Sequence, residues 1–218
     1  TPVLYNFNGQ WLIIGRPQGD IEVYDVKNQE VTQVLSGHSG WIMALALSSN
    51  GKYLASGGTD GTIKLWDMQT GQLVSTWTNP HGRIYTLAFN PTGDYLVSGY
   101  EDKTVLLWKV ESGQSVNLVS EHTRWITCVA FHPSGNYLLT TSGDSYIKIW
   151  DFKTLHLLLT LVYTEEDEWI LYTPTGQVET SLKGSQFVQW KRDQQLYPFE
   201  KFKTEYYVKG LLAKILQQ

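Results

Sequence analysis

Two residue markers recur through the chain at an almost constant interval. Glycines stand 42 residues apart at Gly9, Gly51, Gly93 and Gly135, and the next follows after 41, at Gly176. Aromatic residues keep nearly the same step, with spacings of 42, 42, 42 and 40, at Tyr24, Trp66, Trp108, Trp150 and Trp190. A fixed period of this length indicates a repeat architecture, because each copy encodes one supersecondary unit. The pattern predicts about five copies of a single unit.

Each period contains short runs of β-branched and aromatic residues separated by turn residues. In one unit, residues 41–47, 53–57, 62–67 and 73–77 are typical of strands, with glycine, asparagine and aspartate between them. Four strands in about 40 residues make up the blade of a β-propeller. We therefore expect an all-β propeller of four-stranded antiparallel blades over residues 1–192. The expected blades span about 1–36, 37–79, 80–120, 121–162 and 163–192.

Three of these units carry a family resemblance. The segment GHSGWIMALALSSNGKYLASGGTDGTIKLWD, from Gly37-His38 to Trp66-Asp67, resembles a WD repeat. The next two, PHGRIYTLAFNPTGDYLVSGYEDKTVLLWK and EHTRWITCVAFHPSGNYLLTTSGDSYIKIWD, resemble it in the same register. The resemblance covers residues 37 to 161 and implies a module that binds other proteins.

A histidine, a hydroxyl, an aspartate and a tryptophan recur in these three units. The sets are His38, Ser56, Asp60 and Trp66; His81, Ser98, Asp102 and Trp108; and His122, Thr140, Asp144 and Trp150. One hypothesis is a catalytic triad. Three copies argue against it, since a nucleophile needs one preorganised site. The resemblance implies a structural hydrogen-bond network instead, absent from the first unit, where Tyr24 and Gln18 replace the tryptophan and aspartate.

Cys128 is the one cysteine of the chain and has two interpretations. With His122 and His132 nearby in the sequence, it is a candidate nucleophile. Its counterparts in earlier units are Thr86 and Ala44. A position occupied by alanine, threonine and cysteine favours a small side chain in the core.

The candidate binding residues stand at one end of the repeats. Three residues after the repeat histidine come Trp41, Arg83 and Trp125, and the turn before the third strand adds Thr59 and Glu101. The family resemblance places these residues at the top rim, and tryptophan and arginine are enriched among binding hot spots. The alternative is that both tryptophans pack between blades.

The last part of the chain departs from the repeat. Residues 169–173, 177–181 and 187–191 are typical of strands, with no fourth strand expected after Trp190. The tail, residues 193–218, has apolar residues at helical spacing, so we expect it to be partly helical and to pack on the propeller. Its basic charge favours membrane binding only weakly.

Anchors from Glu168 to Phe199 resemble the C-terminal signature of large bacterial, especially cyanobacterial, WD-repeat proteins, many of which carry a caspase-like peptidase or another effector domain. Gln177-Val178 departs from the aromatic pair of that signature. The first unit opens inside a strand, so we expect the chain to be the C-terminal part of a longer polypeptide. A five-bladed ring is the alternative.

Composition narrows the function classes. Charged residues make up 17% of the chain and the net charge is −4, which predicts no nucleic-acid partner. Apolar runs are too short for a membrane helix, and a single cysteine favours a reducing, cytoplasmic location. We expect no cofactor and no metal.

The sequence thus predicts a non-catalytic protein-interaction module. The alternatives are a hydrolase acting through Cys128 or a triad, an upstream catalytic domain, and a purely structural oligomerisation module.

Overall fold

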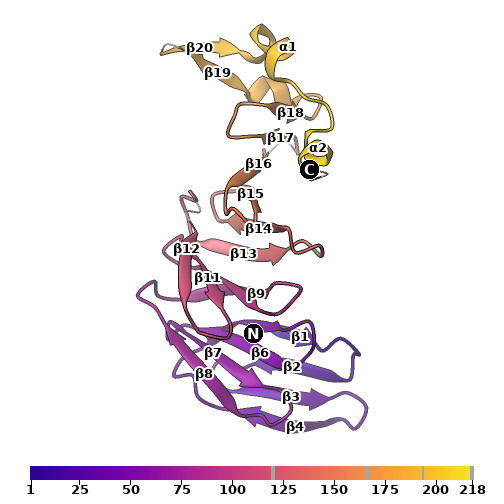
Figure 1. Ribbon diagram of the computed structural model, residues 1–218, viewed down its shortest axis with the longest axis vertical. Helices are drawn as coiled ribbons and strands as arrows, with labels where there is room; N and C mark the ends of the chain where they lie inside the picture. Colours follow the sequence, from indigo (N-terminus) through magenta and orange to yellow (C-terminus); the bar gives the residue numbers. More distant parts are fainter. Residues whose placement is uncertain (119–120, 165–166, 193, 217–218) are drawn as a thin grey trace. The chain divides into compact units, whose positions relative to one another are not determined.

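The computed structural model describes residues 1–118, 121–164, 167–192 and 194–216. It divides into two compact units, Thr1–Asp144 and Ser145–Gln218. The first unit is built from strands alone (Figure 1). They are β1 (Val3–Tyr5), β2 (Trp11–Gly15), β3 (Ile21–Asp25), β4 (Glu30–Leu35), β5 (Ile42–Leu47), β6 (Tyr53–Gly58), β7 (Thr62–Asp67), β8 (Leu73–Thr78), β9 (Ile84–Phe89), β10 (Tyr95–Tyr100), β11 (Val105–Lys109), β12 (Ser115–Leu118), β13 (Ile126–Phe131) and β14 (Tyr137–Ser142).

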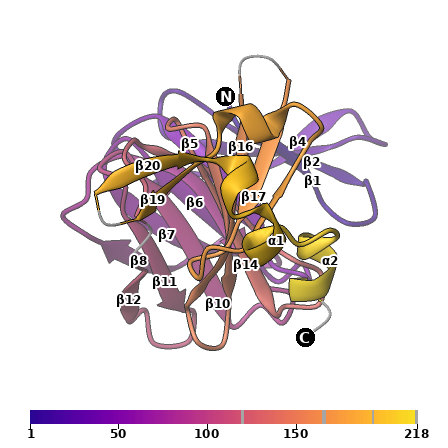
Figure 2. The same cartoon turned by 90° about the horizontal axis from the view of Figure 1, so that it is seen from above.

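The strands of the first unit form antiparallel four-stranded sheets in chain order. Three complete sheets have the orders β1-β2-β3-β4, β5-β6-β7-β8 and β9-β10-β11-β12, and we call them blades 1, 2 and 3. Figure 2 shows β5 to β8 following one another across blade 2. The hairpin β13–β14 continues the series. The predicted all-β class and four-stranded antiparallel units are confirmed, and the strands of blade 2 lie within one residue of the expected ranges.

The core lies between neighbouring blades because side chains alternate along each strand. In β2 and β3, Ile13, Ile21 and Val23 are buried on the face that meets blade 2. They pack there against Leu54 and Trp66 of blade 2, in one hydrophobic cluster. A sheet that buries apolar residues on both faces needs a neighbour on each side, so blades stabilise one another.

One contact repeats at every blade–blade boundary of this unit. A glycine of the second strand lies beneath an isoleucine that opens the first strand of the next blade. A Cβ atom on Gly57 would lie 2.6 Å from Cγ2 of Ile84, closer than side chains approach in proteins. The same contact joins Gly15 to Ile42 and Gly99 to Ile126. These glycines are therefore needed for close approach between blades.

Within the second unit, four strands follow one another in a single sheet. It contains β15 (Tyr146–Asp151), β16 (Leu157–Tyr163), β17 (Trp169–Tyr172) and β18 (Val178–Thr180). Strand β17, expected to open a fifth blade, pairs antiparallel with β16, and β18 pairs with β17. The exposed backbone of an edge strand is a template for the next strand along the chain, which explains this pairing.

A separate hairpin follows, β19 (Gln189–Arg192) with β20 (Gln195–Pro198). The sequence prediction of no strand after Trp190 is therefore wrong. Trp190 and Tyr197 face each other across this hairpin, and such aromatic cross-strand pairs favour strand pairing.

The tail is partly helical, as expected. It contains one turn of 3-10 helix at Phe199–Lys201, then α1 (Lys203–Tyr206) and α2 (Leu211–Leu216). The carboxylate of Glu179 accepts hydrogen bonds from the backbone N–H groups of Gly210 and Leu211, at 2.6 and 2.8 Å, which fixes the start of α2. Leu211 then packs with Leu159 and Leu171. Within the described ranges, every helix is too short or too polar to cross a membrane.

Candidate interaction surface

Blade 2 contains a buried chain of side-chain hydrogen bonds. The indole Nε1 of Trp66 donates to the hydroxyl of Ser56 at 2.8 Å. That hydroxyl lies 2.8 Å from Nε2 of His38, and Nδ1 of His38 lies 2.9 Å from the Asp60 carboxylate. Since an indole only donates and a carboxylate only accepts, the order of donation runs from tryptophan through serine and histidine to aspartate. The bonds connect the loop before β5 to strands β6 and β7.

Burial and hydrogen bonding set the charges in this network. Burial lowers the pKa of the His38 imidazole below its ordinary value, although Asp60 favours the charged ring. For Asp60, burial alone would raise the pKa, but the backbone N–H of Thr62 and the His38 ring outweigh it and leave the pKa lowered. A neutral histidine that donates through Nδ1 to an ionised aspartate satisfies both directions.

The distances match those of a catalytic triad, yet the site cannot work as one. Ser56 is 0% exposed, and its hydroxyl already accepts the indole N–H of Trp66. A nucleophile has to reach a substrate carbonyl beside oxyanion donors, which a sealed hydroxyl cannot do. The arrangement is therefore structural.

The β13–β14 hairpin repeats most of this network. Nε2 of His122 lies 2.9 Å from the hydroxyl of Thr140, and Nδ1 lies 3.0 Å from the Asp144 carboxylate. Threonine replaces serine without loss, because the network uses only its hydroxyl. Trp150, the fourth predicted member, belongs to the second unit.

Blade 3 departs from the predicted network. His81 bonds Asp102 at 2.7 Å, and the indole of Trp108 donates to Ser98 at 2.7 Å. However, Ser98 donates to the phenol oxygen of Tyr100 at 2.9 Å, and in the described part of the chain it has no bond to His81. The predicted histidine–serine link in this blade is therefore corrected.

Tyr100 explains that difference. It occupies the position of Gly58 in blade 2, where no side chain competes with the imidazole. Its fully buried phenol also accepts a hydrogen bond from Nδ2 of Asn79 at 2.9 Å. Burial raises the pKa of Tyr100, which keeps the phenol neutral. Sequence reasoning missed this residue, although a tyrosine at a glycine position of the repeat was a visible signal.

Blade 1 has a different arrangement at the same positions. Ile14 stands where Ser56 stands in blade 2 and offers no hydroxyl to link an imidazole. Arg16, directly after β2, and Glu22 of β3 form an ion pair at 2.5 Å. The sequence expected this blade to lack the network because of Tyr24 and Gln18, and Ile14 adds a third reason.

The network of blade 2 holds a loop whose residues reach the surface. The backbone N–H of Ser39 donates to Asp60 at 3.0 Å, and that of Trp41 donates to the Thr59 hydroxyl at 2.9 Å. The N–H of Thr59 donates in turn to the carbonyl of Trp41 at 2.9 Å. These bonds fix the backbone of Trp41 while its side chain is 62% exposed. The indole is thus presented outward and does not pack between blades.

Trp41 lines a groove between the ends of blades 2 and 3. The groove has a volume of about 380 Å³ and is lined by Trp41, Met43, Thr59, Arg83 and Tyr85. The structure therefore brings together three of the predicted binding residues. Met43 and Tyr85 were missed, although they stand at one shared repeat position, two residues after Trp41 and Arg83.

Glu101 joins the groove through two weak polar contacts. Its carboxylate lies 3.8 Å from the Arg83 guanidinium and 3.5 Å from the Tyr85 hydroxyl. Both charged side chains are about half exposed, so solvent screens the pair and either charge is free to meet a partner. The groove combines an apolar wall with one cation and one anion.

The family comparison agrees with this geometry. The family described as "WD domain, G-beta repeat" matches residues 29–67, 71–109 and 113–151, which together exceed half of the chain. The chain belongs to the WD-repeat family. A comparison with curated proteins found none that matches. Each matched WD repeat begins near the outer strand of one blade and ends with the third strand of the next, as at Asp67 of β7.

Membership in this family has a general functional meaning. WD repeats generally serve as protein-interaction and scaffold modules, and they are generally non-catalytic. The sealed Ser56 hydroxyl of this chain fits that description.

Trp125 occupies the position of Trp41 in the third matched WD repeat, directly before strand β13. Its side chain is 45% exposed, and its ring lies over Gly143, where an added Cβ would come within 2.9 Å of the ring. The Arg124 guanidinium lies 6.0 Å from the ring centroid. Trp125 is therefore a second outward-facing indole, on the element after the groove.

Cys128 is exposed, which corrects the prediction that it lies in the core. Its counterparts Ala44 and Thr86 are buried because β9 and β13, respectively, cover them. Strand β13 is the last inner strand among the described residues of the first unit, so no following inner strand of that unit covers Cys128. Partial burial raises the pKa of the Cys128 thiol, which makes it a poor nucleophile.

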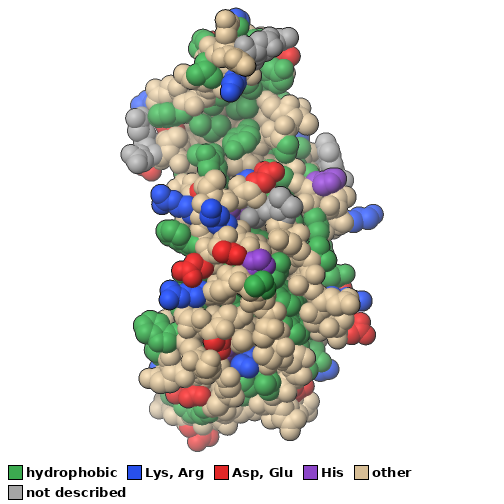
Figure 3. Space-filling view, turned by 90° about the vertical axis from the view of Figure 1, so that its left-hand side faces the viewer, with side chains coloured by type: hydrophobic (Ala, Val, Ile, Leu, Met, Phe, Trp, Pro, Cys, Tyr) green, Lys and Arg blue, Asp and Glu red, His purple; other side chains and the backbone are tan. Residues whose placement is uncertain are grey.

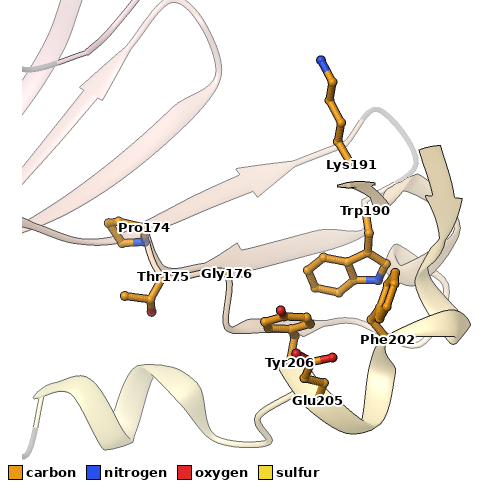
Figure 4. Close-up of a pocket in the computed structure, with 8 residues that line it drawn as sticks. All are labelled: Pro174, Thr175, Gly176, Trp190, Lys191, Phe202, Glu205 and Tyr206. Atoms are coloured by element: carbon orange, nitrogen blue, oxygen red, sulfur yellow. The ribbon is translucent and has the colours of Figure 1, made fainter. Parts of the chain in front are cut away.

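A second cavity lies within the second unit, between the 174–176 turn and the tail (Figure 4). Its volume is about 440 Å³, and Trp190, Phe202 and Tyr206 contribute aromatic rings to it. The ring centroids of Trp190 and Tyr206 lie 4.9 Å apart, and the Trp190 indole donates to the carbonyl of Phe199 at 3.0 Å. In Figure 4 Lys191 points away from these rings. The rings mainly pack against one another, so we assign them to the tail's small core.

Charges are mixed on the surface. On the face shown in Figure 3, acidic and basic side chains are interspersed with hydrophobic ones. Among the residues with described positions, no three histidine, cysteine, aspartate or glutamate side chains gather as metal ligands. The groove beside Trp41 combines an exposed side chain with a backbone that hydrogen bonds hold in place.

Proposed function

We propose that this protein binds a protein partner through the groove between blades 2 and 3. The observation that carries the proposal is Trp41, whose side chain is 62% exposed while hydrogen bonds to Thr59 fix its backbone. Binding at such a surface costs little conformational entropy of the loop, because the loop is already ordered. Exposed tryptophan and arginine side chains are also the types that contribute most to binding energy.

The groove fits an apolar side chain of an extended segment, flanked by charge. Trp41, Met43 and Tyr85 provide the apolar contact, and Arg83 and Glu101 lie at its edge. A partner carboxylate would replace the weak 3.8 Å pair with a charge-assisted bond to Arg83. Trp125 would extend the contact along the rim.

A peptide display library tests this proposal without a known partner. Peptides selected on the wild-type chain should lose at least about tenfold in affinity for Trp41→Ala and for Arg83→Ala. Leu73→Ala is the matched control, since Leu73 is exposed on the outer strand β8, away from the groove, and should leave affinity unchanged. Peptides that bind Trp41→Ala and the wild type equally would refute the groove as the binding site.

The proposed cellular role is that of a regulatory module in a larger bacterial effector, inside the cytoplasm. The anchors between Glu168 and Phe199 support the bacterial context by resemblance, and the single cysteine supports a reducing compartment. A propeller of about five blades, with the groove at its top rim, is part of the same proposal. Partner binding would then act on a catalytic domain outside this segment.

A further inference from the structure

A second groove lies between blades 1 and 2 of the first unit, and we call it the amide groove. It has a volume of about 260 Å³ and is bordered by the turn from β1 to β2 and the turn from β5 to β6. Its apolar lining belongs to the hydrophobic cluster of this boundary and comes from Trp11, Leu47 and Met68. The two turns add carboxamides to the lining, from Asn6, Asn8, Gln10 and Asn50.

The two turns that border the amide groove stand apart, whereas the corresponding turns of later blades touch. A Cβ atom on Gly93, in the β9–β10 turn, would lie 3.7 Å from Cβ of Ser48 in the β5–β6 turn. At the next boundary, a Cβ atom on Gly135 would lie 3.7 Å from Pro91. Gly51 holds this position in the β5–β6 turn, and a Cβ atom there would meet no described atom within 4 Å. The first boundary is therefore open where the next two are closed.

The asparagines of the amide groove use their oxygens within their own turns. Oδ1 of Asn6 accepts the backbone N–H of Trp11 at 2.8 Å. Oδ1 of Asn8 accepts the backbone N–H of Gln10 at 3.0 Å, and Oδ1 of Asn50 likewise accepts a backbone N–H of its turn. Within the described residues, the Nδ2 groups of these asparagines have no hydrogen-bond acceptor. The groove is thus lined by residues with unused donors.

The corresponding turn of blade 3 satisfies its own carboxamide. Asn90 holds the position of Asn6, and its Nδ2 donates to Thr92 and to Asp94, both at 2.7 Å. Blade 1 has two further carboxamides at those two positions and no carboxylate. Because the same repeat position is satisfied in one blade and not in the other, the unused donors are particular to the amide groove.

The lining favours a neutral ligand that is rich in oxygen acceptors. An anion is disfavoured, because no lysine or arginine lines the groove and the Asp25 carboxylate lies 3.4 Å from Nε2 of Gln10. Phe7 also lines the groove and is 71% exposed. The negatively polarised face of its ring attracts weakly positive C–H groups.

We infer that the amide groove binds a neutral sugar ring. Sugar hydroxyls accept from amide donors and rotate their own protons toward water. A peptide backbone would bring N–H groups, for which less acceptor capacity remains because each asparagine Oδ1 already accepts a hydrogen bond. The volume of about 260 Å³ lies just under the range of about 300–1,000 Å³ for small-molecule pockets, so the groove holds a single ring.

Saturation-transfer difference NMR on the full chain tests this site. The probes are glucose, galactose, mannose and N-acetylglucosamine, each as the reducing sugar and as its methyl glycoside. At least one ring should bind with a Kd below about 10 mM. The better binder of a pair identifies the source, because a methyl glycoside represents the end of a glycan and a reducing sugar represents a free metabolite.

Substitutions taken from corresponding turns locate the sugar. Asn8→Ser combined with Asn50→Ser removes donors from both turns and should weaken binding at least about tenfold. Phe7→Ser should weaken it similarly by removing the ring. These variants should fold, because Ser134 and Ser49 already occupy the corresponding positions. Asn136→Ser, at an exposed carboxamide of the β13–β14 turn, is the matched control and should leave binding unchanged.

Three results would overturn the proposal. Absence of binding by all the probes at that limit would show that the amide groove holds no sugar. Unchanged binding in the folded serine variants would place the sugar elsewhere on the chain. Binding of triglycine amide as tight as that of the best sugar would assign the groove to a peptide. The site is separate from the groove of the proposed function, so Trp41→Ala should retain sugar binding, and the two proposals fail independently.

Discussion

Blades 2 and 3 share a sequence pattern but differ in how their histidines are held. In blade 2, His38 is buried and bridges Ser56 and Asp60. In blade 3, His81 is partly exposed and bonds Asp102, while Ser98 donates its hydrogen bond to the phenol of Tyr100 instead of to the histidine. The repeat therefore preserves the end points of the network, the tryptophan–serine and histidine–aspartate bonds. The link between them is exchangeable when another buried hydroxyl is available.

The largest expected effect separates the two histidines. His38→Ala should lower the free energy of unfolding by about 3 kcal/mol, because the Ser56 hydroxyl loses its buried imidazole acceptor and the Asp60 carboxylate loses its imidazole donor. His81→Ala should cost about 1 kcal/mol or less, since its single carboxylate partner is half exposed. Urea unfolding of both variants measures the difference. Equal losses would show that the two blades use their histidines alike.

The next effect concerns the phenol that replaces the imidazole link. Tyr100→Phe should destabilise the chain by about 1–2 kcal/mol, because Ser98 and Asn79 lose a buried hydrogen-bond partner while the ring packing stays. Thermal unfolding measures the loss. Tyr5→Phe, on an exposed ring, should change the melting temperature very little. A Tyr100→Phe variant as stable as the wild type would mean that the phenol only fills space.

The smallest effect is a pH dependence that comes from blade 2. In the unfolded chain His38 takes up a proton near its ordinary pKa of about 6.5, whereas the folded ring has a lowered pKa. The unfolded state thus binds more protons in that range, and stability should fall as the pH decreases from about 7 to about 5. The lowered pKa of Asp60 adds a further loss only at more acidic pH.

Urea midpoints of the wild type and His38→Asn across that pH range check this expectation. The variant lacks the titrating ring, so its midpoint should fall less than that of the wild type. A fall of the same size in both would assign the acid sensitivity to other groups.

Much of the fold was accessible from the sequence because the 42-residue period specifies the strands directly. The network of His38, Ser56, Asp60 and Trp66 followed from the family resemblance, since each member needs a particular donor or acceptor. The link in blade 3 did not follow, because Tyr100 differs at a position that is a glycine in blade 2. The period also gave no warning that Cys128 is exposed. Burial at that position depends on which strand comes next in space.

The pairing of β17 was inaccessible for a related reason. Its residues are typical of a strand, but a strand-forming sequence does not specify which neighbouring strand it pairs with. The free edge of β16 offered β17 a hydrogen-bonding partner, just as a strand of a new blade would have done. The groove was predicted in part, since Trp41 and Arg83 stand at an outward repeat position. Met43 and Tyr85 join it only through the side-by-side placement of β5 and β9.

The recurring contact between a glycine and an isoleucine has an evolutionary consequence. Because Gly15, Gly57 and Gly99 each receive the same side chain from the next blade, every boundary is interchangeable with the others. Duplication of a gene segment encoding one blade would create two boundaries that already fit. Gain or loss of such a segment would lengthen or shorten the array by one blade at a time without requiring a new kind of contact between blades.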